Sequence, residues 1–453
     1  MTNSSSEAGS AALSSLISPA SVPLTSASSL TSPLTAPQLR DAVCARAVST
    51  PLALGPGNLQ AMLTTAGDKP LLLLCFDYAL QQGSIGVAEA DQLQTAVRHA
   101  REQGLHLVWL IESSGIRVTD GTAGIASLRR VLRDVQDARL DGLRLLAMVF
   151  KSAFGGASIL TSVCERRVMN TATLLSMSGP KLIEQSLGTA RFDATDKAAV
   201  TGLLGGAARA ARSADVVLAE ANVSSYLAAL DVWLADAAPE RVDAVWLQHQ
   251  LTQLCARLPQ PLPEPKALPL PSPMLPAHAQ DLLERVLPAH SGVHACEGVL
   301  IAQAAPDSHT RVLALMTPEG CTARDALALT RELLRPQALA YTRSVLLVDA
   351  PGHAATPEDE QLVFSEVLAL LSLAIRWLHR QGQRMDVVVS GSGGGGIQAA
   401  LAAGASSVTM GPKARLYVLP KAAMQALNKA EDEDAGTLAT ALATGAIDHA
   451  FIG

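Results

Sequence analysis

The sequence predicts an α/β protein made of two similar domains in tandem. Apolar segments with strand character alternate with segments of helical period along most of the chain, a pattern typical of a mainly parallel sheet covered by helices on both faces. The same order of segments occurs twice. Between the two series, residues 258–276 hold eight prolines in nineteen positions, a composition that neither a helix nor a central strand tolerates.

These observations divide the chain into four parts. Residues 1–38 are rich in Ser, Ala, Thr and Pro, and we expect a disordered tail there. A first domain is expected over 39–257 and a second over 278–453. The proline-rich segment 258–277 is expected to be an extended linker between them.

Composition limits the class of protein. The 453 residues are 49% hydrophobic and only 3% aromatic, so the core must consist mainly of Ala, Leu and Val. The net charge is −6 with no long basic run, which argues against a nucleic-acid partner. No apolar run reaches the roughly 18 residues of a membrane span, and the N-terminus lacks the basic start of a signal peptide. The six cysteines are scattered without a C-x-x-C pair. We therefore expect no metal site and a cytoplasmic location.

In the first half, each predicted strand ends in a polar or glycine-rich turn that precedes a helix. We expect strands near 71–76, 105–111, 143–150 and 168–169, and helices near 89–103, 122–141 and 155–165. Residues 181–257 are expected to be mostly helical.

The second half repeats this order. We expect strands near 298–302, 312–316, 344–349, 385–390 and 408–410, and helices near 278–287, 322–334, 358–380 and 397–403. Two glycine turns thus occupy matching places, Phe154-Gly155-Gly156 in the first half and residues 391–396 in the second.

A strand that ends in glycines at the start of a helix can bind negative charge. The first backbone N–H groups of the helix have no partner within it, the helix dipole adds positive charge, and glycine permits close approach. Such a turn can stabilise an oxyanion. Neither turn is followed by Lys-Ser or Lys-Thr, and the sequence has no G-x-S-x-G elbow, so a P-loop and a serine hydrolase are both disfavoured. Loss of CO₂ from a malonyl thioester needs mainly an oxyanion hole and fits better.

Several of these segments resemble a known family. Residues 82–86, 115–117, 154–156 and 178–184 are similar to the β subunit of biotin-independent malonate decarboxylase, and residues 348–353 and 391–396 are similar to its γ subunit. Both subunits belong to the acyl-CoA carboxyltransferase group of the ClpP/crotonase-like superfamily. The resemblance implies two crotonase-like domains of ββα units, with β and γ fused in one chain.

The resemblance also implies site residues and partners. Gly155 and Gly156 match the first oxyanion turn, and Gly394 and Gly395 match the second. The substrate side is expected to include Gly83, Ser84, Gly86, Gly115, Arg117, Phe154, Ser178 and His353. The substrate would be a malonyl thioester on CoA or on the phosphopantetheine arm of an acyl carrier protein, with no cofactor bound covalently to this chain. A dimer, or a hetero-oligomer with an acyl-carrier transferase subunit, is expected.

Two other functions stay open. The same fold serves as the carboxyltransferase component of biotin-dependent acyl-CoA carboxylases. The chain also departs from the family pattern: Val200-Thr201-Gly202-Leu203 stands where the β subunit carries Trp-Arg, and Val418-Leu419-Pro420-Lys421 where the γ subunit carries a histidine. These departures favour a divergent, non-catalytic or biosynthetic-pathway subunit.

Overall fold

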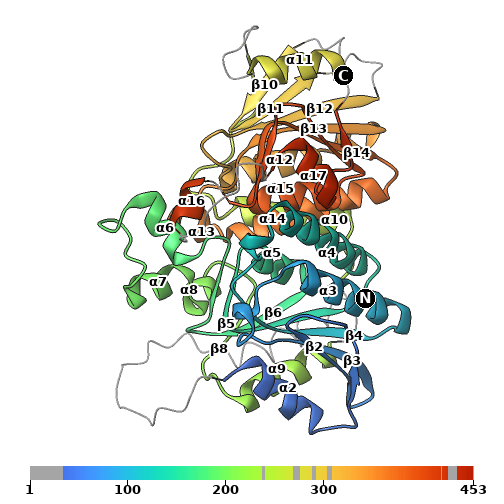
Figure 1. Cartoon of the computed structure of the whole chain (residues 1–453), viewed down its shortest axis with the longest axis vertical. Helices are drawn as coiled ribbons and strands as arrows, with labels where there is room; N and C mark the ends of the chain where they lie inside the picture. The colour runs from blue at the N-terminus through green and yellow to red at the C-terminus, as the bar shows by residue number, and fades with distance from the viewer. Residues whose placement is uncertain are drawn as a thin grey trace, which may run out of the picture.

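The computed structural model describes residues 34–236, 240–268, 276–287, 292–303, 309–419, 421–426 and 436–451. Within these ranges the chain forms two large sheets, with helices between them and on their outer faces (Figure 1). None of the helices described is long and apolar enough to cross a membrane.

The first sheet combines an antiparallel hairpin with a parallel array. Its strand order is β1-β2-β3-β4-β5-β6-β8, and β7 pairs with the far end of β5. Pairing is antiparallel from β1 to β3 and parallel from β3 onward. The strands are β1 Thr50–Leu52, β2 Leu59–Ala66, β3 Lys69–Phe76, β4 His106–Ser113, β5 Leu145–Phe154, β6 Arg166–Asn170, β7 Leu174–Ser176 and β8 Val216–Leu218.

The second sheet has the same design. Its order is β9-β10-β11-β12-β13-β14-β15-β17, and β16 pairs with the far end of β14. Pairing is antiparallel from β9 to β12 and parallel from β12 onward. The strands are β9 Lys266–Ala267, β10 Gly292–Cys296, β11 Val299–Gln303, β12 Thr310–Met316, β13 Arg343–Ala350, β14 Arg384–Gly394, β15 Ser407–Met410, β16 Arg415–Tyr417 and β17 His449–Ala450.

The helices alternate with the strands. In the first half they are α2 Ala36–Cys44, η1 Gln81–Gly83, α3 Val87–Gln103, η2 Val118–Asp120, α4 Thr122–Leu140, α5 Gly156–Val163, α6 Pro180–Leu187, α7 Lys197–Leu204, α8 Gly206–Ala210, α9 Val223–Ala235 and α10 Ala244–Cys255. In the second half they are α11 Ala277–Val286, α12 Ala323–Leu333, η3 Pro336–Ala340, α13 Pro357–Gln361, α14 Phe364–Arg380, α15 Gly395–Gly404, α16 Lys421–Ala426 and α17 Leu438–Thr444.

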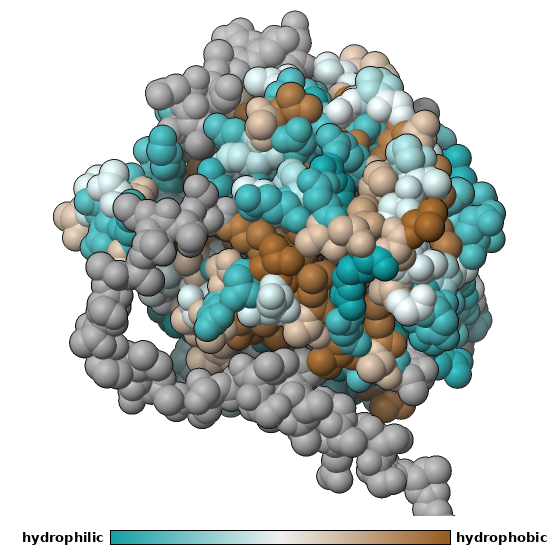
Figure 2. All heavy atoms as spheres, turned by 90° about the horizontal axis from the view of Figure 1, so that it is seen from below, coloured by the Kyte–Doolittle hydropathy of each residue, from teal (hydrophilic) through white to brown (hydrophobic). Residues whose placement is uncertain are grey.

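The apolar runs in the sequence are strands that are buried on both faces. Leu72, Leu74 and Phe76 of β3 face the helices between the sheets, whereas Leu71, Leu73 and Cys75 face α2 and α9 on the outside. Side chains alternate between the two faces of a strand, and both faces of β3 are covered by helices. Both sets of side chains must therefore be apolar, and the sequence shows no alternation of apolar and polar residues. Figure 2 views the molecule from the side of α2 and α9 and shows apolar residues gathered between polar ones.

The layer between the sheets belongs to both halves. Helix α4 packs against α15, and α5 packs against α14. Their side chains join those of both sheets in one continuous apolar core, and Figure 1 shows these helices in the middle of the molecule. The two halves therefore meet through a shared helical layer, which we call the seam.

The two halves match in fine detail. In each, the second parallel pair of strands, β4 with β5 and β13 with β14, has a register shift near its end, at Ile111/Ser113 and at Val348/Ala350. Each shift is followed by a parallel bridge, Ile85 to Ile116 in the first half and Cys321 to His353 in the second. These bridges make Ile116 and His353 structural counterparts.

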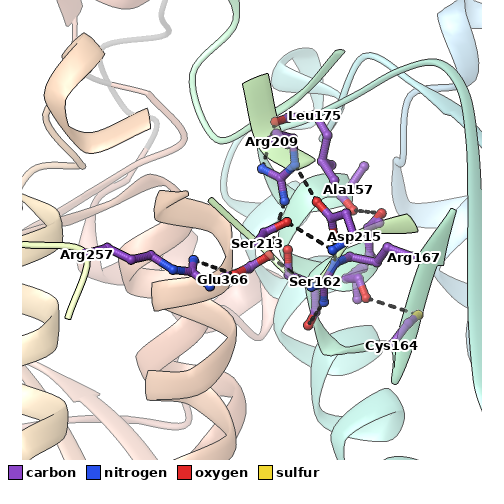
Figure 3. Close-up of polar contacts among 12 residues, drawn as sticks. Ala157, Ser162, Cys164, Arg167, Leu175, Arg209, Ser213, Asp215, Arg257 and Glu366 are labelled. Carbon is purple, nitrogen blue, oxygen red and sulfur yellow. Dashed lines mark hydrogen bonds and ion pairs between the residues drawn. The ribbon is translucent and has the colours of Figure 1, made fainter. Parts of the chain in front are cut away.

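A buried ion cluster also joins the halves (Figure 3). Asp215 accepts from Arg167 and, at 2.7 Å, from Arg209 Nε. Glu366 of α14 pairs with Arg167 at 2.9 Å and with Arg257 at 2.9 Å. Burial alone would raise the pKa of Asp215, but the two guanidinium groups outweigh it and hold that pKa well below its usual range. The cluster keeps its charges paired at the edge of the seam, as buried charges require.

Some sequence expectations differ from the structure. Residues 1–33 and 269–275 lie outside the described residues, but helix α2 already begins at Ala36, inside the expected tail. Within the expected linker, Lys266–Ala267 forms the edge strand β9. The single helix expected over 358–380 is two helices, α13 and α14, because Val363 between them adopts φ +59°.

Candidate functional site

The first glycine turn lies between β5 and α5. Gly155 has φ +53° and ψ −129°, a conformation that disfavours any residue with a Cβ. Its N–H donates to the carbonyls of Ser176 and Met177, each at 3.2 Å. The amide of Gly155 is therefore already used by the loop after β7, which we call the seam loop (residues 176–179). It is not free to hold an oxyanion in this structure.

Gly156 is the remaining amide of the predicted pair. It is the first residue of α5, so its N–H has no acceptor within the helix. A Cβ on Gly156 would lie 2.6 Å from Ile116 Cγ1 and 2.7 Å from Leu128 Cδ2. The glycine is thus needed for close packing against α4, and its N–H is the better placed of the two to bind negative charge.

The second glycine turn lies between β14 and α15. Gly395 has φ +55°, nearly the value of Gly155, whereas Gly394 is extended with φ −167°. Gly394 pairs with Tyr417, as Phe154 pairs with Ser176 in the first half. The counterparts of Gly155 and Gly156 are therefore Gly395 and Gly396, one residue later than the sequence match to Gly394 and Gly395.

Met177 separates the two turns. A Cβ on Gly396 would lie 2.5 Å from Met177 Cε, and one on Gly155 would lie 4.0 Å from the same atom. Ser158 Oγ contacts Met177 Sδ at 3.9 Å. The side chain is buried and fills the space that a substrate between the turns would occupy.

Ser178 and His353, which the sequence suggests separately, contact each other across the seam. Ser178 Oγ lies 3.1 Å from His353 Nε2, and both side chains are buried. His353 Nδ1 is buried without a hydrogen-bond partner among the described residues. It lies 3.5 Å from the position that a Cβ would take on Gly395. Burial lowers the pKa of His353 to about 4, so the ring is neutral near pH 7.

Glu360 of α13 completes this cluster, although it is not among the site residues predicted from the sequence. Its carboxylate accepts from the N–H of Ser178 at 2.5 Å and of Met177 at 3.2 Å. Burial raises the pKa of Glu360 to about 7, although the hydrogen bonds from Ser178 and Met177 oppose the rise. Three acidic residues follow one another at 358–360. Nothing in that run marks the third as the residue that faces the seam loop.

The other predicted residues of the first half form the wall behind the first turn. Gly115, with φ +103°, would place a Cβ 2.7 Å from the carbonyl of Phe154. A Cβ on Gly83 would lie closer still, 1.9 Å from the carbonyl oxygen of Glu112, and Ser113 Oγ donates to the Gly83 carbonyl at 2.8 Å. The chain is drawn together here by backbone contacts that only glycine permits.

Arg117 does not extend toward the turns. Its guanidinium donates to Glu89 at 2.7 Å and to Ser84 Oγ and the Ser84 carbonyl at 3.3 Å each. Gly86 lies beneath it, because a Cβ there would lie 2.3 Å from Arg117 Nη1. The three predicted residues Ser84, Gly86 and Arg117 thus form an internal structural cluster, in which the arginine already has a carboxylate partner.

Three cavities lie away from the glycine turns. One, of about 960 Å³, is at the amino ends of β4 and β5 and is lined by Lys69, Arg98 and Arg144 among others. One of about 430 Å³ lies between α10 and α14, and one of about 250 Å³ adjoins the ion cluster. In the part of the chain that is described, no three His, Cys, Asp or Glu side chains are grouped as metal ligands.

With this geometry in place, the comparisons with known proteins point to one class. No protein-family model matches the sequence. The chain is homologous to carboxyltransferases that act on acyl thioesters, and these relatives are enzymes.

Two curated relatives represent this class. The malonyl-S-ACP:biotin-protein carboxyltransferase of Malonomonas rubra is 24% identical over 166 residues, which cover 33% of this chain and 52% of that protein. The acetyl-coenzyme A carboxylase carboxyl transferase subunit beta of Flavobacteriaceae bacterium (strain 3519-10) is 23% identical over 119 residues, or 26% of this chain and 42% of that protein. The chain thus spans about half, or less, of the length of the curated relatives it matches.

Solved structures are similar only at a low level. A Pseudomonas malonate decarboxylase hetero-tetramer in complex with malonate matches 50% of this chain and 91% of its own, with 20% identity and a TM-score of 0.42. The match to the beta subunit of P. aeruginosa geranyl-CoA carboxylase covers 93% of this chain and 84% of that subunit, with 15% identity and a TM-score of 0.38. These scores are too low to carry an argument about function.

Proposed function

We propose that this chain is a decarboxylase of a malonyl-type thioester, and that the reaction occurs at the seam between its two halves. The observation that carries the proposal is the meeting of two equivalent glycine turns at one place. Gly155 and Gly395 share φ values of +53° and +55°, both turns contact Met177, and Ser178 and His353 lie beside them.

The chemistry follows from what these groups can stabilise. When CO₂ leaves a malonyl thioester, the bonding electrons move into the thioester carbonyl and form an enolate. A backbone N–H aimed at that oxygen can supply about 3 kcal/mol of transition-state stabilisation. The amide of Gly156, at the start of α5, is the donor we assign to this role. Loss of CO₂ then needs only a proton for the enolate carbon.

The two sheets share one strand order apart from the additional edge strand β9 of the second sheet, and this likeness further suggests an internal duplication. We infer that each half is a crotonase-like domain and that the chain unites two units corresponding to β and γ subunits. The thioester would be carried by CoA or by the phosphopantetheine arm of an acyl carrier protein. A hetero-oligomer with an acyl-carrier transferase subunit would then deliver the malonyl group.

Carboxyl transfer is the second candidate, because both curated relatives are carboxyltransferases by name. The first half of the reaction is the same in both cases. In the second candidate the carboxyl group passes to biotin on another protein instead of leaving as CO₂. A requirement for biotinyl protein, and inhibition by avidin, would distinguish transfer from simple decarboxylation.

The test is release of ¹⁴CO₂ from [3-¹⁴C]malonyl-CoA and from malonyl carrier protein by the purified chain. We expect turnover that is insensitive to avidin and that is lost in Gly156→Val. Gly202→Ala is the matched control, since a Cβ there meets nothing within 4 Å. Absence of ¹⁴CO₂ with both substrates, together with absence of ¹⁴C label on added biotinyl protein, would refute both enzymatic candidates and favour a non-catalytic subunit.

A further inference from the structure

Glu360, Ser178 and His353 lie in a row that crosses the seam and ends at the second glycine turn. We propose that they form a proton relay, in which His353 Nδ1 delivers the proton to the enolate carbon and Glu360 supplies it through Ser178. This inference rests on the proposed function, because it names the proton source for that reaction.

The hydrogen bonds set the direction of the relay. Ser178 Oγ lies 3.1 Å from His353 Nε2, and the Glu360 carboxylate accepts from the N–H of Ser178 at 2.5 Å, which places it beside the hydroxyl of the same residue. A hydroxyl has one proton to donate. When Glu360 is ionised, it attracts that proton, so Nε2 must carry the ring proton and Nδ1 is an acceptor. When Glu360 is protonated, Ser178 donates to Nε2, and the ring proton is on Nδ1.

The orphaned nitrogen points to a ligand. His353 Nδ1 is buried and has no partner among the described residues, which is costly unless something else occupies its hydrogen-bonding position. A position with no other atom closer than 3.5 Å lies beside it at the second turn, where a Cβ would stand on Gly395. Two backbone hydrogen bonds of 2.9 Å, between Cys321 and the residues on either side of His353, fix the backbone there.

The carboxylate is held in place at a cost in backbone strain. Val363 adopts φ +59°, which is a true outlier for a β-branched residue. Its N–H donates to the Glu360 carbonyl at 3.0 Å. Strain of this kind persists where the surrounding structure demands one geometry and often marks functional sites. Here it turns the chain between α13 and α14 so that Glu360 faces the seam loop while Phe364 packs against the His353 ring.

The proposed step balances without an imidazolium. The enolate carbon takes the proton from Nδ1 and forms a C–H bond with its own electron pair. Nε2 takes the proton of Ser178, and Ser178 takes the proton of Glu360, which becomes a carboxylate and is later reprotonated by solvent. The ring stays neutral throughout, in keeping with the burial that lowers the pKa of His353. The charged neighbour that acts on Glu360 is Asp359 of the same helix, which raises its pKa further.

The relay can be tested apart from CO₂ release. Run in reverse, it abstracts a proton from the methyl group of an acetyl thioester, so the wild-type chain should exchange the methyl protons of acetyl-CoA with deuterium in D₂O. Ser178→Ala keeps both backbone N–H donors of Glu360 but breaks the relay. We expect at least a hundredfold loss of exchange in Ser178→Ala and Glu360→Gln, and little loss in Ser127→Ala, a buried serine whose hydroxyl has no partner in the described part of the chain.

A second measurement does not depend on activity. The ¹⁵N shifts of His353 in the folded chain should move from the Nδ1–H to the Nε2–H tautomer as pH rises through about 7, the pKa of Glu360. Glu360→Gln should abolish that shift. An unchanged tautomer from pH 5.5 to 8.5, or full exchange activity in Ser178→Ala, would overturn the relay even if CO₂ is released. A tautomer shift and methyl exchange without CO₂ release would support the relay and refute decarboxylation.

Discussion

The two glycine turns share a backbone but differ in what stands behind them. Gly155 and Gly395 have φ values two degrees apart (+53° and +55°), and each follows a strand that bends at the same place. Behind the first turn lies Ile116, whereas its counterpart behind the second is His353. The first turn is therefore sealed by an apolar side chain and the second faces an imidazole. One scaffold thus supplies two functions, with close packing and the seam loop from the first half and titratable groups from the second.

The largest effect is expected when the difference between the turns is removed by making the second turn like the first. His353→Ile replaces the imidazole with the residue of the first half and places an apolar side chain beside Phe364 and Ser178. We expect turnover to fall about 10²- to 10⁴-fold, the usual contribution of a positioned acid or base, with folding retained. Single-turnover ¹⁴CO₂ and methyl-exchange assays measure the loss, and circular dichroism checks the fold. Activity within twofold of wild type would mean that the difference between the turns is structural only.

Glu360 gives the next largest effect, on stability. Its pKa in the folded chain is about 7, above the value near 4.3 expected when unfolded. The folded chain therefore holds more protons between these values, and this carboxyl's contribution to the free energy of unfolding falls as pH rises from about 4.5 to about 7. The total change is up to about 3 kcal/mol. His353, with a lowered pKa, acts in the opposite direction below pH 6.5.

Urea titrations of wild type and Glu360→Gln between pH 4.5 and 8 isolate this term. In the glutamine variant, the free energy of unfolding should no longer fall over this pH range, and the variant should gain stability relative to wild type above pH 7. Parallel pH profiles for the two chains would show that Glu360 is not buried as described.

The losses of stability caused by a methyl group added behind each turn should differ by a smaller amount. Gly156→Ala forces a methyl group against Ile116 and Leu128, inside a close-packed layer, and should cost about 1–3 kcal/mol. Gly396→Ala meets the flexible end of Met177 instead, so the side chain can move and the cost should be lower. Thermal unfolding of both variants compares them. Equal losses would indicate that Met177 is held as firmly as the helices.

The smallest difference is expected between Gly155→Ala and Gly395→Ala. Because the two positions have nearly the same φ, the backbone strain is the same, and the two losses of stability should agree within about 0.5 kcal/mol. Turnover should fall more in Gly395→Ala, since the added methyl group lies 3.5 Å from His353 Nδ1. A larger loss of turnover in Gly155→Ala would reverse the assignment of roles to the two turns.

Much of this arrangement could be predicted from the sequence, because local rules governed it. The run Leu71–Phe76 is a strand since both its faces are covered, and the glycine turns occur where the close approach of backbone requires them. The register of the second turn could not be predicted. Four consecutive glycines at 393–396 offer no side chain to mark which one takes positive φ.

The features that could not be predicted from the sequence depend on long-range packing. The helix pattern over 358–380 gives no sign of the break at Val363, because that break serves a contact between Glu360 and a loop more than 180 positions earlier in the chain. Likewise, Ser178 and His353 are 175 positions apart, and their contact depends on how the halves dock. Met177 looked like an ordinary loop residue, although it fills the space between the turns.

The shared helical layer has a consequence for how the proposed reaction centre would be assembled. Groups from both halves are joined by one covalent chain, so the centre would form by a unimolecular docking event rather than by encounter of separate subunits. A tether of this kind gives the second half an effective concentration in the millimolar range around the first. Dilution should leave the activity per molecule unchanged, and the supply of the two complementary halves is equal by construction.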